Sequence, residues 1–224
     1  MRDIIVLGIG GSTFARIELA KACGYKIGGL YHYNSDRTGQ IDHGYIIDGS
    51  FEDLFGQSIE GKYFLLTMGD MKIRQDLYRR ITSAGGIVPS LIHPKAEVSE
   101  FAYISPNGVI IDSQAIIQSD CYISEGVFIC SQVMICHQTH IEPYVFIAPK
   151  AIVGARLKIG QFSFIGQNAT IISTKVKEIG KYSTIGAGSV VTKQVLDNMI
   201  MVGNPAKIMN AMDAKMQTGG VKTT

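Results

Sequence analysis

Two histidines lie three residues apart in the second half of the chain, in the stretch Ile135-Cys136-His137-Gln138-Thr139-His140. An imidazole changes its protonation state near neutral pH, so it can accept a proton from a substrate or ligate a metal ion. A histidine pair without a neighbouring carboxylate is not typical of a metal site. We therefore expect no metal here, and the residues alone leave two interpretations of His137 open: a general base or a solvated histidine at a turn.

A glycine-rich segment near the N-terminus could hold a phosphate. Gly8-x-Gly10-Gly11-Ser12-Thr13 separates the apolar run Ile4–Leu7 from a helical pattern over Phe14–Cys23. Backbone N–H groups at such a helix N-terminus bind anions. Thr13 stands where a dinucleotide fingerprint has its third glycine, and the second strand ends without an acidic residue in His32-Tyr33-Asn34. The segment predicts phosphate binding and argues against NAD.

Strands and helices alternate over residues 1–90, which predicts a small α/β domain with a parallel sheet. We expect strands over 4–7, 27–33, 63–67 and 87–88, and helices over 14–23, 51–55 and 72–84. Gly85-Gly86 ends the last of these helices.

Residues 91 to about 211 form the second predicted domain, in which an aliphatic side chain recurs every six residues, first at Ile92, Val98 and Ile104 and then, in a shifted phase, from Ile111. Every sixth residue from Ile111 to Ile171 is isoleucine or valine, and the residue four positions later is mostly small. The rhythm breaks at Ser173–Glu178 and returns at Ile179. A fixed short period predicts a solenoid in which three hexads form one triangular coil of a parallel β-helix. Two-residue alternation, as in a β-sandwich, would not give this pattern. Residues 212–224 are small and polar, and we expect a flexible tail.

Composition excludes several classes of protein. The formal net charge of +2 gives no field for nucleic acid, and no apolar stretch is long enough to span a membrane. The four cysteines match no zinc motif and are typical of reduced cytosolic thiols. The first residues lack the features of a signal peptide, so we expect a cytoplasmic protein.

The hexads Ile159-Gly160, Ile165-Gly166, Ile179-Gly180 and Ile185-Gly186 resemble those of the hexapeptide-repeat acyltransferases. A narrower resemblance covers nearly the whole chain, through Gly69-Asp70-Met71-Lys72-Ile73-Arg74, Leu91-Ile92-His93-Pro94 and Val202-Gly203-Asn204-Pro205-Ala206-Lys207. It is to the sialic acid O-acetyltransferase and bacillosamine-pathway nucleotide-amino-sugar N-acetyltransferase family. The resemblance implies a left-handed β-helix, a homotrimer, acetyl-CoA as co-substrate and a Rossmann-like N-terminal domain that holds a nucleotide sugar.

By this resemblance His137 is the catalytic base. The family places an acidic residue that orients the histidine directly after it, and here that catalytic position is Gln138. We expect Gln138 to hydrogen-bond the imidazole, although it carries no charge to stabilise an imidazolium. A second family histidine corresponds to Phe146. His140 is expected on the surface, and His93 is expected to be structural.

The resemblance also assigns the binding residues. Acetyl-CoA is expected to contact the coil glycines and two lysines: Gly166, Gly186, Ala187, Gly188, Lys193 and Lys207. The nucleotide sugar is expected to contact the glycine turn, the end of the second strand and the start of the last helix: Gly10, Gly11, Ser12, Thr13, His32, Tyr33, Asn34, Lys72 and Arg74.

Three functions remain open at this point. The first is N-acetylation of a nucleotide-linked 4-amino sugar, UDP-linked by default, in surface-glycan biosynthesis. The second is O-acetylation of sialic acid or another small acceptor. The third is a non-catalytic trimeric scaffold, which Gln138 and Phe146 keep open.

Overall fold

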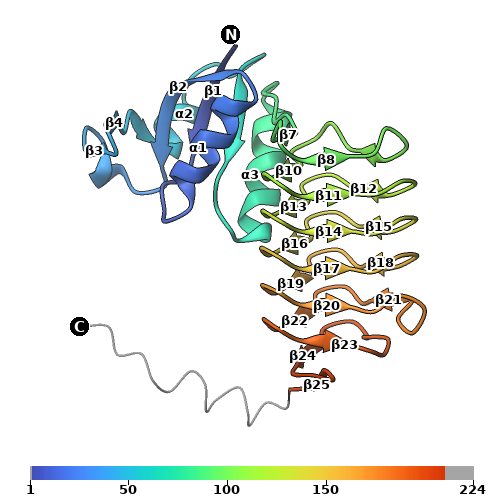
Figure 1. Cartoon of the computed structure of the whole chain (residues 1–224). Coiled ribbons are helices and arrows are strands. Elements are labelled where there is room, and N and C mark those ends of the chain that lie inside the picture. Colours follow the sequence, from blue (N-terminus) through green and yellow to red (C-terminus); the bar gives the residue numbers. More distant parts are fainter. Residues whose placement is uncertain (1, 210–224) are drawn as a thin grey trace.

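The computed structural model describes residues 2–209, which form a four-stranded parallel sheet with helices, followed by a stack of coils (Figure 1). The sheet order is β5-β2-β1-β6. Its elements are β1 (Arg2–Leu7), α1 (Thr13–Ala22), β2 (Tyr25–His32), β5 (Gly49–Ser50), α2 (Phe51–Phe55), β6 (Tyr63–Leu66) and α3 (Met71–Ser83). A short 3-10 helix (Ser35–Arg37) and a hairpin of β3 (Ile41–Asp42) and β4 (Tyr45–Ile46) follow β2.

Local sequence explains the helix boundaries. The Asp70 side chain accepts the backbone N–H groups of Lys72 and Ile73 and so caps α3. Ser50 and Asp53 form a reciprocal capping box on α2. The Ser12 side chain, in contrast, makes no capping bond to α1. The first-turn N–H groups of α1 are therefore not occupied by their own cap residue.

The coils form three sheets, which we call the first, second and third face of a triangular prism. The first face contains β7 (Leu91–Ile92), β10 (Ile110–Ile111), β13 (Phe128–Ile129), β16 (Phe146–Ile147), β19 (Phe164–Ile165), β22 (Thr184–Ile185), β24 (Ile200–Val202) and β25 (Lys207–Ile208). The second contains β8 (Glu97–Val98), β11 (Ile116–Ile117), β14 (Met134–Ile135), β17 (Ile152–Val153), β20 (Thr170–Ile171) and β23 (Val190–Val191). The third contains β9 (Tyr103–Ile104), β12 (Tyr122–Ile123), β15 (His140–Ile141), β18 (Lys158–Ile159) and β21 (Glu178–Ile179).

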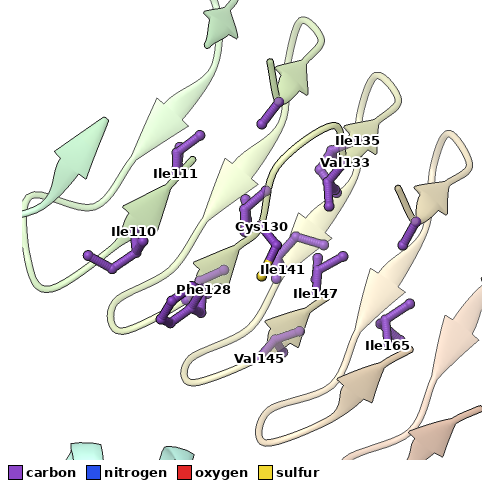
Figure 2. Close-up of a cluster of buried hydrophobic side chains, with 14 of the residues drawn as sticks. Ile110, Ile111, Phe128, Cys130, Val133, Ile135, Ile141, Val145, Ile147 and Ile165 are labelled. Atoms are coloured by element: carbon purple, nitrogen blue, oxygen red, sulfur yellow. The ribbon is translucent and has the colours of Figure 1, made fainter. Parts of the chain in front are cut away.

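The recurring aliphatic side chains fill the interior of the prism. Each is the second residue of its strand, and Ile135, Ile141 and Ile147 are fully buried in successive strands (Figure 2). Apart from β25, which pairs antiparallel with β24, the strands pair in parallel with the strand one coil later, for example Ile117 with Ile135. This ladder satisfies the backbone polar groups along the stack. The predicted parallel β-helix is confirmed, and the arrangement fits the left-handed β-helix fold of acetyltransferases.

A left-handed backbone residue recurs at the coil corners, three positions after the inward aliphatic. Gln132, Gln138 and Arg156 all have φ near +60°. Non-glycine residues seldom adopt this conformation, and the hexad pattern does not indicate it. At these corners the conformation turns the chain from one face to the next.

The N-terminal unit is joined to the first coils by two arginines. Arg16 of α1 pairs with Asp112, and Arg74 of α3 donates to the Gly108 carbonyl oxygen at 3.0 Å. Both guanidinium groups lie over the Phe128 ring, at 4.5 Å and 5.0 Å from its centroid. Burial lowers the pKa of Arg74 to about 10, so it stays charged at neutral pH. Cation–π contact stabilises such a buried charge.

Most predicted elements appear within a few residues of their expected bounds, but two details differ. The segment expected as a strand over 87–88 makes only an isolated bridge, between Tyr63 and Ile87. The β3–β4 hairpin and β5, the edge strand of the parallel sheet, were not predicted, because their two-residue strands are too short for a periodic pattern.

The expected tail, 212–224, lies outside the described residues. Over residues 2–209, no helix has the length and apolar character that crossing a bilayer requires.

Candidate active site

His137 lies at the corner between the second and third faces, two residues after the end of β14. Its side chain is half-buried and lines a cavity of about 490 Å³. The wider loop at the break in the hexads, 173–177, contributes four of the seven lining residues. The cavity is lined by His137, Ala155, Arg156, Ser173, Thr174, Val176 and Lys177. The interruption in the repeat therefore makes room beside His137.

A glutamine from the preceding coil contacts His137. Gln118 Oε1 accepts the backbone N–H of His137 at 3.0 Å and lies 3.4 Å from its Nδ1. Gln118 follows β11 as Cys136 follows β14, so the coil stacking brings it beside His137. Sequence reasoning missed this residue. The 18-residue coil period was the signal that could have found it, because it places residues 118 and 119 next to 136 and 137.

Gln138 does not contact the His137 ring. Its backbone is left-handed, with φ of 57°, and its side chain is exposed. Its Oε1 accepts a hydrogen bond from Arg156 Nε at 2.9 Å. The expectation that Gln138 hydrogen-bonds the imidazole is therefore wrong, because the corner conformation directs this side chain away along the edge.

The other candidate positions of this region lie elsewhere. His140 is exposed on the third face, with its ring 4.8 Å from that of Tyr122. Phe146 lies on the first face, stacked between Phe128 and Phe164. His93 Nδ1 accepts the Lys95 backbone N–H at 3.0 Å within the turn that enters the coils. None of these side chains lines the His137 cavity.

Cys136 precedes His137 and is half-buried. Burial raises the pKa of the Cys136 thiol, so it stays protonated at neutral pH and is a poor nucleophile. In the described part of the chain, no group of three or more His, Cys, Asp or Glu side chains could hold a metal ion. Proton transfer by the imidazole is the chemistry that this corner offers.

A second cavity, of about 350 Å³, lies where β1, β2 and β6 end. Its lining brings together six of the predicted nucleotide-sugar residues: Gly10, Gly11, Ser12, Thr13, His32 and Tyr33. Thr13 and Thr67 fix the floor through a 3.0 Å contact between their hydroxyl groups. His32 is buried and accepts the Asn34 backbone N–H on Nδ1 at 3.0 Å, so its Nε2 carries the proton. The Tyr33 ring is 76% exposed at the rim.

Three predicted residues lie outside this cavity. The Asn34 side chain accepts the Asp36 backbone N–H and caps the 3-10 helix. Lys72 is exposed and pairs with Asp76 on α3. Arg74 is buried at the junction with the coils, so the predicted contact with a diphosphate does not fit its position.

The predicted acetyl-CoA residues lie mainly on another edge of the prism. Gly166 and the segment 186–188 are at the corner between the first and second faces. A Cβ on Gly166 would come within 2.6 Å of the Ala187 nitrogen, so this glycine is required for coil stacking. Gly188, with φ of 66°, faces open space. Lys193 follows β23 at the second-to-third corner, and Lys207 is exposed on β25.

Comparison with known proteins identifies the family. No family model matches the chain. The acetyltransferase domain of PglB from Neisseria gonorrhoeae FA1090, solved with acetyl coenzyme A, is 30% identical, with a TM-score of 0.83. The match covers 93% of this chain and 99% of that one. The chain belongs to the sialic acid O-acetyltransferase and bacillosamine-pathway N-acetyltransferase family.

Two further relatives of this acetyltransferase are sugar N-acetyltransferases. A histidine-to-asparagine variant of perosamine N-acetyltransferase from Caulobacter crescentus, solved with CoA and GDP-perosamine, is 25% identical, with a TM-score of 0.85 over 94% of this chain and 98% of that one. The dTDP-3-amino-3,6-dideoxy-alpha-D-galactopyranose 3-N-acetyltransferase of Aneurinibacillus thermoaerophilus is 46% identical over 44 residues. That segment spans 20% of this acetyltransferase and 22% of the relative.

Proposed function

We propose that this acetyltransferase moves the acetyl group of acetyl-CoA to the amine of a nucleotide-linked amino sugar. The observation that carries the proposal is the presence, in one chain, of an imidazole in an open cavity and a second cavity at a helix N-terminus. The relatives solved with acetyl-CoA, or with CoA and GDP-perosamine, support the same pair of substrates. A UDP-linked 4-amino sugar is the default acceptor.

His137 supplies the base for this reaction. An amine attacks a thioester only through its lone pair, so the proton on the attacking nitrogen must leave as the C–N bond forms. The imidazole takes this proton, the C–S bond breaks, and the thiolate of CoA leaves and is protonated. No carboxylate forms an ion pair with His137 among the described residues. In this proposal His137 therefore acts without a paired carboxylate.

The N-terminal unit, residues 1–90, holds the nucleotide in this proposal. Ser12 leaves the first-turn N–H groups of α1 without a side-chain cap, and such groups bind phosphate oxygens. The cavity lining contains no Lys, Arg, Asp or Glu, so the diphosphate would be held by backbone dipoles. The exposed Tyr33 ring offers a surface on which a nucleobase can stack, and His32 Nε2–H offers one donor.

A homotrimer would complete the site on residues 91–211. His137 and Gly188 lie on the two edges that flank the second face, so one chain alone does not bring them together. The outward side chains of this face are Glu97, Ile116, Met134, Ile152, Thr170 and Val190, and the four aliphatic ones among them form a stripe that only Thr170 interrupts. Packing of three second faces around one axis would bury this stripe and bring the His137 edge of one copy beside the Gly188 edge of the next.

Transfer assays test the proposal. The purified chain is incubated with acetyl-CoA and UDP-, dTDP- or GDP-linked amino sugars, and CoA release and product mass are followed. We expect an N-acetylated nucleotide sugar, with its amine proton lost and one CoA released per turnover. O-acetylation of sialic acid would support the second function instead. No turnover, together with no thermal stabilisation by acetyl-CoA or any nucleotide sugar, would support a scaffold. A cytoplasmic location and a role in surface-glycan biosynthesis are part of the same prediction.

A further inference from the structure

Gln118 has a defined orientation beside His137. Its own backbone N–H donates to the Ile135 carbonyl oxygen at 3.0 Å, which fixes the residue in the coil ladder. Its Oε1 accepts the His137 backbone N–H at 3.0 Å. A backbone N–H can only donate, so the amide must present its oxygen, and not its NH2 group, to His137. The usual ambiguity between the two ends of a glutamine amide is therefore removed.

This orientation determines the tautomer of the imidazole. The same oxygen lies 3.4 Å from His137 Nδ1 and offers only lone pairs. A favourable contact requires hydrogen on Nδ1, which leaves the lone pair on Nε2. The opposite tautomer would place two lone pairs against each other. A single acceptor thus holds the ring through its backbone and its side chain.

Other groups near the ring do not compete for this role. Gln138 Oε1 is bonded to Arg156, and the Arg156 backbone N–H donates to the His137 carbonyl oxygen at 3.0 Å. These contacts stabilise the backbone of the corner, but they do not involve the ring nitrogens of His137. In the part of the chain that the structure describes, no other side chain forms a hydrogen bond to the His137 ring.

We propose that Gln118 is the positioning residue for His137: its amide oxygen holds hydrogen on Nδ1 and leaves the Nε2 lone pair to accept the proton from the attacking amine. The proposal rests on the proposed acetyl transfer for its catalytic consequence only. The C–N bond forms, the C–S bond breaks, and the proton moves from the amine to Nε2. The neutral amide of Gln118 thus takes the orienting role of the family's acidic residue. It does so from the preceding coil, and not from position 138.

Kinetics of Gln118 variants test this role. Gln118→Leu should lower kcat roughly 10- to 100-fold, with the KM for acetyl-CoA within about twofold, because the ring loses its preferred tautomer and not a substrate contact. Gln118→Glu should restore activity and move the acid limb of the pH–rate profile upward by about one pH unit, since a carboxylate favours the imidazolium. The matched control is Glu142→Ala, because Glu142 Oε2 accepts the Gln161 backbone N–H at 2.9 Å by the same coil-to-coil contact at another corner. It should keep wild-type kcat.

Nitrogen NMR tests the tautomer without any turnover. With 15N-labelled histidine, the signals absent from His137→Asn are assigned to His137. We expect a protonated Nδ1 and an unprotonated Nε2 in the wild type at pH 8, and a mixture in Gln118→Leu. Hydrogen on Nε2 in the wild type, or an unchanged kcat and tautomer in Gln118→Leu, would overturn the proposal. An inactive wild type with the expected tautomer would count against the proposed function and not against the Gln118 contact.

Discussion

The N-terminal unit and the coils position their functional groups in different ways. In the N-terminal unit, the ends of β1, β2 and β6 bring Gly10, His32 and Thr67 to one cavity from distant parts of the chain. In the coils, Gln118 and His137 meet because residues one turn apart are stacked by a fixed period. The position of the functional groups therefore depends on individual loops in the N-terminal unit, and on the register between stacked strands in the coils. The same contrast indicates which substitutions should impair binding and which should impair chemistry.

Replacement of His137 should produce the largest effect. His137→Asn removes the base and should lower kcat by about 100-fold or more, with an unchanged melting temperature, because the ring lies at a corner and not in the core. Steady-state kinetics and thermal melts measure this. His140→Asn, on the third face, is the control and should keep activity within about twofold. An equal loss of kcat in His137→Asn and His140→Asn would mean that His137 is not the specific base.

A charge on the second face should separate the subunits of the proposed homotrimer. Ile152 is 42% exposed at the centre of the apolar stripe, so Ile152→Asp should convert a trimer to a monomer and lower activity about 100-fold. Light scattering gives the mass. Tyr122→Asp places the same charge on the third face, where Tyr122 is 45% exposed, and should leave the mass unchanged. A wild-type monomer with full activity would contradict a shared site.

Removal of the Tyr33 ring should affect binding alone. Tyr33→Ala should raise the KM for the nucleotide sugar about tenfold and leave the KM for acetyl-CoA unchanged, because loss of a stacking surface costs about 1.4 kcal/mol. Tyr33→Phe keeps the ring and should behave as wild type. A fall in kcat without a change in KM would place Tyr33 outside the nucleotide site.

Arg74 should affect stability and not substrate affinity. Arg74→Met removes the bond to the Gly108 oxygen and the charge over Phe128, and should cost about 2 kcal/mol, or roughly 5 °C in melting temperature. Lys72→Met, on the exposed side of the same helix, is the control. An unchanged melting temperature with a tenfold higher KM for the nucleotide sugar would show that Arg74 serves the substrate after all.

The smallest expected effect is the pH dependence contributed by Glu142. Burial raises its pKa, but hydrogen bonds from Lys158 Nζ and the Gln161 backbone N–H outweigh this and lower the pKa below its ordinary value. The ionised group therefore stabilises the fold above the unfolded pKa of about 4.3, and this stability is lost as pH falls through the lower folded pKa. Glu142→Gln should lower the melting temperature by roughly 2 °C at pH 7 and not at pH 3. If the melting temperature of Glu142→Gln were lower than that of the wild type by the same amount at pH 7 and pH 3, the ion pair could not be the cause of the difference.

Much of the fold was predictable because each element has a strong local pattern. The six-residue aliphatic period needs only the burial of one side chain per strand, so the period alone places Ile135 and Ile141 in the interior. The glycine turn and His32 were likewise brought to one cavity by the expected strand–helix order. Gln138 and Arg74 were misplaced, because a left-handed corner and a contact between α3 and the first coils have no signature in neighbouring residues.

The sequence by itself determined the coils, the parallel sheet, the family and the candidate base, because periodicity and short motifs are local properties of the chain. Only the tertiary structure decided that Gln118 contacts the imidazole and that His137 and Gly188 lie on opposite edges of one face. It also decided that Arg74 joins the two units. These facts depend on which turns lie side by side after the coils stack, and side-chain direction at a corner follows the backbone conformation there.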